Sequence, residues 1–242
     1  MKLWITFLLL GSLSFANNFD KGIKAFENGD METASKFFLE ACDSGHTDGC
    51  NHIGAMYKNG VSVRNDNFKA AEFYAKACDG GNPLGCTNLG LMYSNGRGVE
   101  QSHIQAIIYY SKACDANNSM GCTNLGIKYA NGLGIQQDDF KAVELFTKAC
   151  NGGDAMGCSY LGIMYEDGKG IEQNNFKAVE FYTKACEGQN GGGCNNLSLM
   201  YMHAKGVEQD TQKAIDFSAK SCEYGEEQGC QNHAHYKEHF EL

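Results

Sequence analysis

Residues 161–186 read LGIMYEDGKGIEQNNFKAVEFYTKAC, and this stretch decides the fold because the rest of the chain repeats its pattern. The repeat period is 36 residues, and it is clearest in the cysteines, which stand in pairs eight residues apart. The 12 cysteines are Cys42, Cys50, Cys78, Cys86, Cys114, Cys122, Cys150, Cys158, Cys186, Cys194, Cys222 and Cys230. A tyrosine series keeps the same step: Tyr57, Tyr93, Tyr129, Tyr165 and Tyr201. A fixed period in this range indicates an array of stacked structural repeats.

Each repeat is predicted to contain two helices. In one copy, Leu125 and Tyr129 are four residues apart and share a helix face, and Gly132 then ends that helix. The second helix is expected to begin at Asp138, with Phe140, Val143, Phe146 and Ala149 on its apolar face. Good N-cap residues recur at the matching positions, namely Asp66, Ser102, Asn174 and Asp210. Glycine also recurs within the first helix, at Gly54, Gly90, Gly126 and Gly162, which indicates close helix packing.

The predicted fold class is all-α, an α/α superhelical solenoid of 36-residue repeats. A pair of amphipathic helices cannot bury its apolar faces alone, so neighbouring repeats must stack and the two ends need caps. Residues 17–46 are expected to form an N-terminal capping helix pair, residues 47–225 five full repeats, and residues 226–242 a C-terminal capping helix. No linker or low-complexity segment interrupts residues 17–242, which we therefore expect to form a single solenoid domain.

Residues 1–16 have the features of a secretory signal peptide. Lys2 is followed by the apolar run LWITFLLL, and small residues occupy the −3 and −1 positions, Ser14 and Ala16, of a predicted cleavage site. The apolar run is too short to cross a bilayer, and no other stretch reaches that length. We expect a secreted protein, extracellular or periplasmic, with no membrane span after cleavage.

The composition and the missing motifs exclude several classes of function. The chain is 43% hydrophobic, which is too high for a disordered protein, and its net charge of −9 comes without a basic patch for nucleic acid. The hydrolase motifs S-x-x-K, H-E-x-x-H and G-x-S-x-G do not occur, and neither do the P-loop and dinucleotide fingerprints. No cofactor is predicted, and whether the protein is an enzyme stays open.

The cysteine spacing favours disulfides over a metal site. Zinc sites use C-x2–4-C spacing, which the C-x7-C pairs do not match, so no metal is expected. Two regular disulfide patterns are compatible with the spacing. One joins Cys42 to Cys50 and so on along the chain, and the other joins Cys50 to Cys78.

The pattern L-G-x-M-Y-x-x-G-x-G-[VI], followed by D-x-x-K-A-x-x-[FY]-[YFT]-x-K-A-C, resembles the Sel1-like repeat, a relative of the tetratricopeptide repeat. The added C-x7-C is similar to the Helicobacter cysteine-rich protein family. This resemblance implies one disulfide per repeat and supports the Cys42–Cys50 pattern. The resemblance also implies that the protein binds penicillin with weak β-lactamase activity. It further implies that the protein is secreted and meets the host immune system. Ser62, Ser198 and Ala204 depart from the pattern, each replacing a glycine.

A ligand groove is predicted on the first helices, which commonly line the concave surface of a solenoid. Its candidate residues are Asn88, Asn124 and Asn196, with Met92, Lys128 and Met164. Asparagine offers donors and acceptors to a peptide backbone, and methionine adds adaptable apolar contact. The alternative is that these asparagines cap helices or pack locally.

Three further features have both a functional and a structural interpretation. His235 and His239 are four residues apart and could share a metal, or belong to a solvated cap. Glu166 and Asp167 could act as an acid–base pair, or lie at a solvated helix end. The tyrosine series could bind an aromatic ligand, although core packing is the simpler interpretation.

Two functional hypotheses follow. The first is a protein that binds peptide-like ligands, cell-wall fragments or β-lactams, with slow β-lactam hydrolysis implied only by the resemblance. The alternative is a non-enzymatic scaffold that engages host or envelope proteins. The sequence names no catalytic residue, and the protein is expected to be a monomer.

Overall fold

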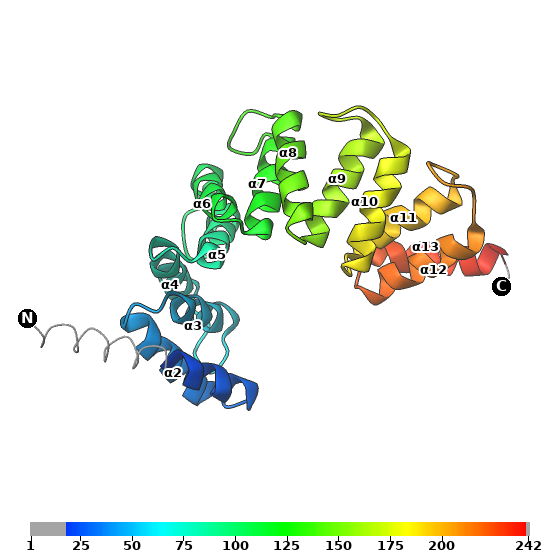
Figure 1. Ribbon diagram of the computed structural model, residues 1–242. Coiled ribbons are helices and arrows are strands. Elements are labelled where there is room, and N and C mark those ends of the chain that lie inside the picture. The colour runs from blue at the N-terminus through cyan, green and yellow to red at the C-terminus, as the bar shows by residue number, and fades with distance from the viewer. Residues whose placement is uncertain (1–17, 241–242) are drawn as a thin grey trace, which may run out of the picture. The chain divides into compact units, whose positions relative to one another are not determined.

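The computed structural model describes residues 18–240, and all regular structure in that part of the chain is helical (Figure 1). Residues 18–27 form the first helix. The helices that follow are α2 (Met31–Asp43), α3 (Thr47–Asn59), α4 (Asn67–Asp79), α5 (Pro83–Asn95), α6 (His103–Asp115), α7 (Ser119–Asn131), α8 (Asp139–Asn151), α9 (Ala155–Asp167), α10 (Asn175–Glu187), α11 (Gly191–Met202), α12 (Thr211–Glu223) and α13 (Glu227–Phe240). The predicted all-α solenoid fold is confirmed. The predicted signal peptide, residues 1–16, lies outside the described residues.

The helices form two compact units, the first ending at Ala116 and the second beginning at Asn117. From α2 onward, every helix of a unit packs on the next one along the chain. The first helices of successive repeats, with the closing helix α13, also contact each other directly. These contacts join α3 with α5 in unit 1, and α7, α9, α11 and α13 in succession in unit 2. The first helices of each unit therefore lie side by side and form one continuous layer, against which the second helices pack.

The helix ends agree with the local sequence. The side chains of Asp66, Asp138 and Asp210 each accept a hydrogen bond from the backbone N–H three residues later, at 2.9–3.0 Å. Ser102 and Asn174 cap α6 and α10 in the same way. The predicted starts of the second helices are thus confirmed. The first helices mostly end at a glycine in the left-handed conformation, for example Gly132 with a φ of 65°.

The recurrent helix glycine makes room for an aromatic ring of the following helix. A Cβ added at Gly90 would lie 2.6 Å from the Tyr110 ring, and one at Gly126 would lie 2.6 Å from Phe146. Ser198 replaces this glycine in the last repeat, where the facing position is Ser218 instead of an aromatic residue. The Ser198 hydroxyl donates to the carbonyl oxygen of Ala214 at 2.7 Å, so the added polar atom has a partner.

Disulfides join the end of each second helix to the start of the next first helix. The pairs Cys42–Cys50, Cys78–Cys86, Cys150–Cys158, Cys186–Cys194 and Cys222–Cys230 have Cα–Cα distances of 4.4–4.5 Å. Cys114 and Cys122 are disulfide-bonded as well, which gives six bridges and no free cysteine in the described chain. The prediction of one disulfide per repeat is confirmed. Six bridges indicate an oxidising environment, extracellular or periplasmic.

One residue of the predicted apolar helix face lies elsewhere. Phe140 was expected to share that face with Phe146, but its side chain is 78% exposed while Phe146 is fully buried. Phe140 is two residues before Ala142, which is fully buried, and residues two apart point to different sides of a helix.

Across residues 18–240, no helix combines the length and the apolar character needed to cross a bilayer.

Candidate functional site

Half of the residues predicted to line a groove are buried in the structure. Met92, Lys128 and Met164 are only 2–6% exposed, so they belong mainly to the core and do not present a ligand surface. The physical reason is their spacing, since each is three residues after a buried leucine, as Met92 is after Leu89, and shares its helix face. Burial lowers the pKa of Lys128, whose aliphatic stem occupies the position that methionine takes in the other repeats.

The three asparagines are half-buried, and they do not form one row of equivalent donors. Asn88 donates its amide to Asn51 of the preceding first helix at 2.9 Å, and Asn124 donates to the Met120 carbonyl of its own helix at 2.9 Å. Asn196 lines a cavity of about 310 Å³ together with Tyr160 and Asn195. The local-packing alternative therefore describes Asn88 and Asn124, while Asn196 faces open space.

The acidic and histidine pairs have structural partners. Glu166 accepts a hydrogen bond from the Tyr182 hydroxyl at 2.8 Å and from Lys205 at 2.9 Å. Asp167 pairs with Lys169 at 2.8 Å. The His235 and His239 rings lie 4.1 Å apart, and within residues 18–240 no three His, Cys, Asp or Glu side chains are grouped to hold a metal ion.

The tyrosine series forms half-buried aromatic stacks between the two helices of a repeat. Tyr165 stacks on Phe181 with ring centroids 5.4 Å apart. Lys177 lies over the Tyr165 ring at 5.1 Å, and Lys184 lies over the Phe181 ring at 4.8 Å. The same arrangement of lysine, two rings and lysine occurs around Tyr57 and around Tyr201. Each stack holds a first helix against its second helix, which is a structural role for the series.

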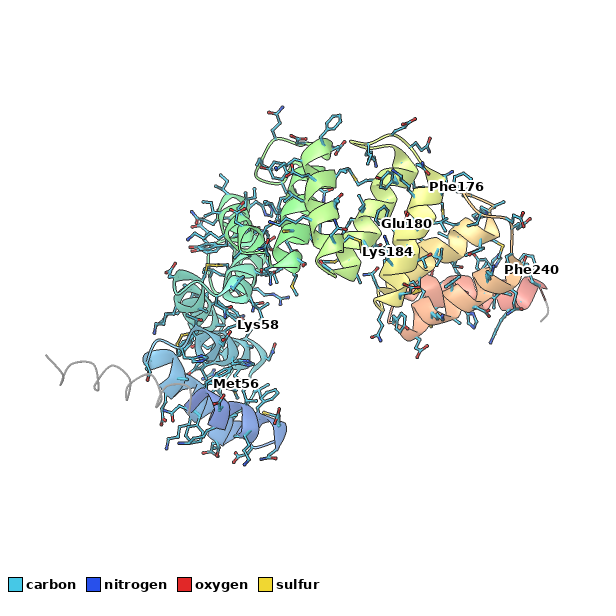
Figure 2. The ribbon with its side chains drawn as sticks, viewed as in Figure 1. Met56, Lys58, Phe176, Glu180, Lys184 and Phe240 are labelled. Carbon is cyan, nitrogen blue, oxygen red and sulfur yellow. A yellow bond between two sulfur atoms is a disulfide. The ribbon has the colours of Figure 1, made fainter. Side chains whose placement is uncertain are left out.

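The most unusual surface feature is a set of exposed apolar side chains at the start of the second helices, which we call the apolar series. Its members share one position in the repeat, two residues after the N-cap: Phe68, Ile104, Phe140 and Phe176, which are 77%, 62%, 78% and 76% exposed. Unit 1 carries the first two and unit 2 the last two. Phe176 lies at the start of α10, away from the labelled Glu180 and Lys184 farther along that helix (Figure 2).

The apolar series was missed by the sequence analysis, although its signal is present in the sequence. The period of 36 residues includes these positions, and their offset from the buried alanine of the same helix places them on the solvent side. Single exposed hydrophobic residues are ordinary, whereas a large apolar side chain exposed at the same position of successive repeats indicates a surface with a role.

A surface groove adjoins the first member of the series. It has a volume of about 730 Å³ and is lined by Tyr57, Val63 and Phe68 together with polar groups that include Arg64 and Lys69. A lysine follows each phenylalanine of the series, at Lys69, Lys141 and Lys177. The groove thus places apolar side chains beside charged groups of both signs, Arg64, Asp66 and Lys69, an arrangement that suits contact with a partner.

Solved structures similar to this chain are themselves repeat proteins. A Sel1 repeat protein from Oxalobacter formigenes is 25% identical, with a TM-score of 0.80 over 88% of this chain and 84% of that one. A protective antigen of uropathogenic Escherichia coli strains with an SLR fold is 29% identical, with a TM-score of 0.77 over 87% of this chain. This chain spans 46% of that protein. Helicobacter pylori cysteine rich protein B is 32% identical over 52% of this chain and 91% of its own, with a TM-score of 0.44.

Comparison with curated proteins gives no match. Comparison with protein families gives a match along most of the chain. The family described as Sel1 repeat matches five consecutive segments, residues 47–82, 83–118, 119–154, 155–190 and 192–225. These segments cover well over half of the sequence and follow the repeat period found in it, so the protein belongs to the Sel1 repeat family.

Proposed function

We propose that this disulfide-rich repeat protein is a non-enzymatic interaction scaffold that binds a partner protein through the apolar series. The observation that carries the proposal is the recurrence of a large exposed side chain at one position of four successive repeats. Burying one phenylalanine in an interface stabilises it by about 1.5–3 kcal/mol, so two within one unit supply a substantial part of a specific interaction.

The rigidity of the repeats supports this role. Each member of the series follows a capped helix start, and the repeat behind it is held by a disulfide and by tight glycine–aromatic packing. Side chains on such a scaffold lose little conformational freedom when a partner binds, which favours affinity.

The proposal includes export of the protein to the extracellular space or the periplasm, with residues 1–16 as the signal peptide. Six disulfides support it, since such bonds persist in oxidising compartments. The similarity to a protein described as a protective antigen supports it further.

β-Lactam hydrolysis, implied by the resemblance to the Helicobacter cysteine-rich proteins, finds no support in the site. All cysteines of the described chain are in disulfides, and Glu166 is engaged by Tyr182 and Lys205. The β-lactamase motifs are missing from the sequence, so no observation favours hydrolysis as a second candidate function.

The test selects phage-displayed random 12-residue peptides on the oxidised protein and measures the affinity of the selected peptides for two double variants. Phe140→Ser/Phe176→Ser removes the apolar series from unit 2. Phe26→Ser/Phe240→Ser removes two phenylalanines that are 44% and 45% exposed at other places, and serves as the matched control.

We expect the selected peptides to bind the first variant at least tenfold more weakly than the wild type, because contacts at an interface hot spot are each worth more than about 1 kcal/mol. The control variant should keep wild-type affinity. Equal binding to both variants, or failure to select any peptide on the folded protein, would overturn the proposal.

A further inference from the structure

The ring that packs on the helix glycine is a tyrosine in three repeats, and the chain provides two of these buried hydroxyls with a partner. The Tyr182 hydroxyl donates to Glu166, which is 16 residues earlier, at 2.8 Å. Tyr110 hydrogen-bonds with Ser94 at the same offset. Where the ring is Phe146 and has no hydroxyl, the residue at that offset is alanine. The residue 16 positions earlier thus follows the hydrogen-bonding need of the ring.

Tyr74 breaks this pattern. Its side chain is fully buried, and its hydroxyl has no hydrogen-bond partner in the protein. The residue at the partner position is Lys58, whose ammonium group donates hydrogen bonds and cannot accept one. Burial raises the pKa of Tyr74 to about 12, so the hydroxyl keeps its proton and remains a donor at neutral pH. A buried donor without an acceptor is rare and calls for an explanation, such as an ordered water or a bound group.

Tyr74 is one of the residues that line a cavity in unit 1. The cavity has a volume of about 90 Å³, and it lies where α3, α4 and α5 meet. Two cationic residues, Lys58 at the end of α3 (Figure 2) and Arg97 just after α5, line it with Tyr74. Its remaining lining residues are Asn88, Leu91, Met92 and Asn95, and none of them is acidic. A water molecule occupies about 30 Å³, so the cavity has room for a group of a few atoms.

The fourth repeat of the chain shows which group fits. There the Glu166 carboxylate accepts from the Tyr182 hydroxyl at 2.8 Å and pairs with Lys205 at 2.9 Å. Lys205 stands 39 residues after Glu166, and Arg97 stands 39 residues after Lys58. Tyr74 and Arg97 therefore repeat the positions of Tyr182 and Lys205, while Lys58 replaces the carboxylate between them by a second cation.

We propose that this cavity, which we call the Tyr74 cavity, binds a carboxylate group carried by a peptide ligand. The carboxylate accepts the Tyr74 hydroxyl proton in a hydrogen bond and pairs with Arg97 and Lys58, as Glu166 does within the chain at the equivalent place. The planar fork of Arg97 can pair with both oxygens of a carboxylate. The cavity shares no residue with the unit 2 part of the apolar series, so this inference stands apart from the proposed scaffold role.

The test is an NMR titration of the ¹⁵N-labelled oxidised protein with four probes. Acetyl-Ala-Ala-Ala with a free C-terminal carboxylate tests the chain end, and acetyl-Ala-Asp-Ala-amide tests a side-chain carboxylate. Acetyl-Ala-Ala-Ala-amide lacks the charge, and inorganic phosphate tests a tetrahedral anion. We expect at least one carboxylate probe to bind and to shift the amide signals of residues 58 and 97. The probe that responds identifies whether the carboxylate comes from a chain end or a side chain. Equal binding of the uncharged amide, tighter binding of phosphate, or no binding of either carboxylate probe would overturn the proposal.

Variants test the geometry. Tyr74→Phe removes only the hydroxyl and should weaken binding by roughly three- to tenfold, the effect of one hydrogen bond. Tyr110→Phe is the matched control, because the Tyr110 hydroxyl already has Ser94 as its partner, and its affinity should stay unchanged.

Lys58→Glu places a carboxylate beside Tyr74, as Glu166 is placed beside Tyr182. This variant should lose probe binding and melt at a higher temperature than the wild type. Lys58→Met, which supplies no carboxylate, should weaken binding without that gain in stability. Unchanged probe affinity in Lys58→Glu would overturn the assignment. Phe140→Ser/Phe176→Ser should bind the probes like the wild type, which keeps failure of the scaffold proposal distinguishable from failure of this one.

Discussion

Gly162 lies directly against the ring of Tyr182, so closely that an added Cβ would stand 2.6 Å from two of its ring carbons. This contact fixes the distance between α9 and α10. Glycine within a helix costs up to about 1 kcal/mol relative to alanine, and here the cost is offset by the burial of a whole aromatic ring.

Gly162→Ala should therefore destabilise the protein, by roughly 1–3 kcal/mol, because the ring has to shift within a packed core. Gly192→Ala is the matched control, since a Cβ at that helical glycine would meet no atom closer than 3.4 Å. The control should be stabilised by up to about 1 kcal/mol through helix propensity alone. Urea unfolding followed by circular dichroism measures both changes. A stabilised Gly162→Ala variant would contradict the packing described here.

The disulfides should contribute measurably to stability. Cys186→Ala/Cys194→Ala removes one bridge, which joins two cysteines that are eight residues apart in the sequence. The chain-entropy model gives a loss of about 2.6 kcal/mol for such a loop. The melting temperature of the variant should fall, and full reduction of the wild type should lower it further. Equal melting temperatures for the oxidised variant and the wild type would show that the bridge adds nothing to stability.

The buried tyrosines predict a loss of stability at alkaline pH. Burial raises the pKa of Tyr74 and of Tyr110 to about 12, against about 10 in the unfolded chain. Below pH 10 both states bind the phenolic proton and stability is unaffected. Between pH 10 and 12 the unfolded state loses the proton first, so the free energy of unfolding falls.

The absorbance of tyrosinate at 295 nm measures this effect. The native protein should show a delayed component of ionisation that disappears in guanidinium chloride. Tyr74→Phe/Tyr110→Phe should reduce that component. A single titration step near pH 10 in the native protein would contradict the burial of these hydroxyls.

β-Lactam turnover is expected to be slow at most. The described chain has no free thiol and no group of three metal-ligating side chains, and no S-x-x-K motif is present in the sequence. Hydrolysis of a penicillin core compound is measured on protein from a host that lacks its own β-lactamase, together with intact-mass spectra. No covalent adduct should form. A turnover number near the enzyme median of about 10 s⁻¹ would reveal an active site that the geometry does not suggest.

The helices and their caps could be predicted from the sequence because their signals are local and repeated. Asp138 and its counterparts cap the second helices as expected. The cysteine spacing favoured disulfides but left two pairings open, and the resemblance to the Helicobacter cysteine-rich proteins supported the Cys42–Cys50 pattern. The candidate groove was less predictable. Met92 follows Asn88 by four residues but the core residue Leu89 by three, and only packing decides which face it joins.

The Tyr74 cavity could not be anticipated from a local pattern. It depends on three positions separated by 16 and 39 residues, whose relation appears only when the repeats are stacked. The repeat alignment does contain the relevant signal, since a lysine at residue 58 replaces the acceptor that a buried tyrosine needs. The exchange at residue 58 becomes visible when the repeats are aligned and their differences are compared as well as their shared residues.

The placement of the bridges also determines how the chain responds to proteolysis. The turns at residues 44–46, 80–82 and 188–190 lie inside disulfide loops, so a cut there leaves both fragments covalently joined. The longer connections within a repeat, such as residues 60–66, lie outside every loop, and a cut there divides the chain. A protein nicked by an extracellular protease would therefore migrate intact or divided on a non-reducing gel according to which kind of turn was cut.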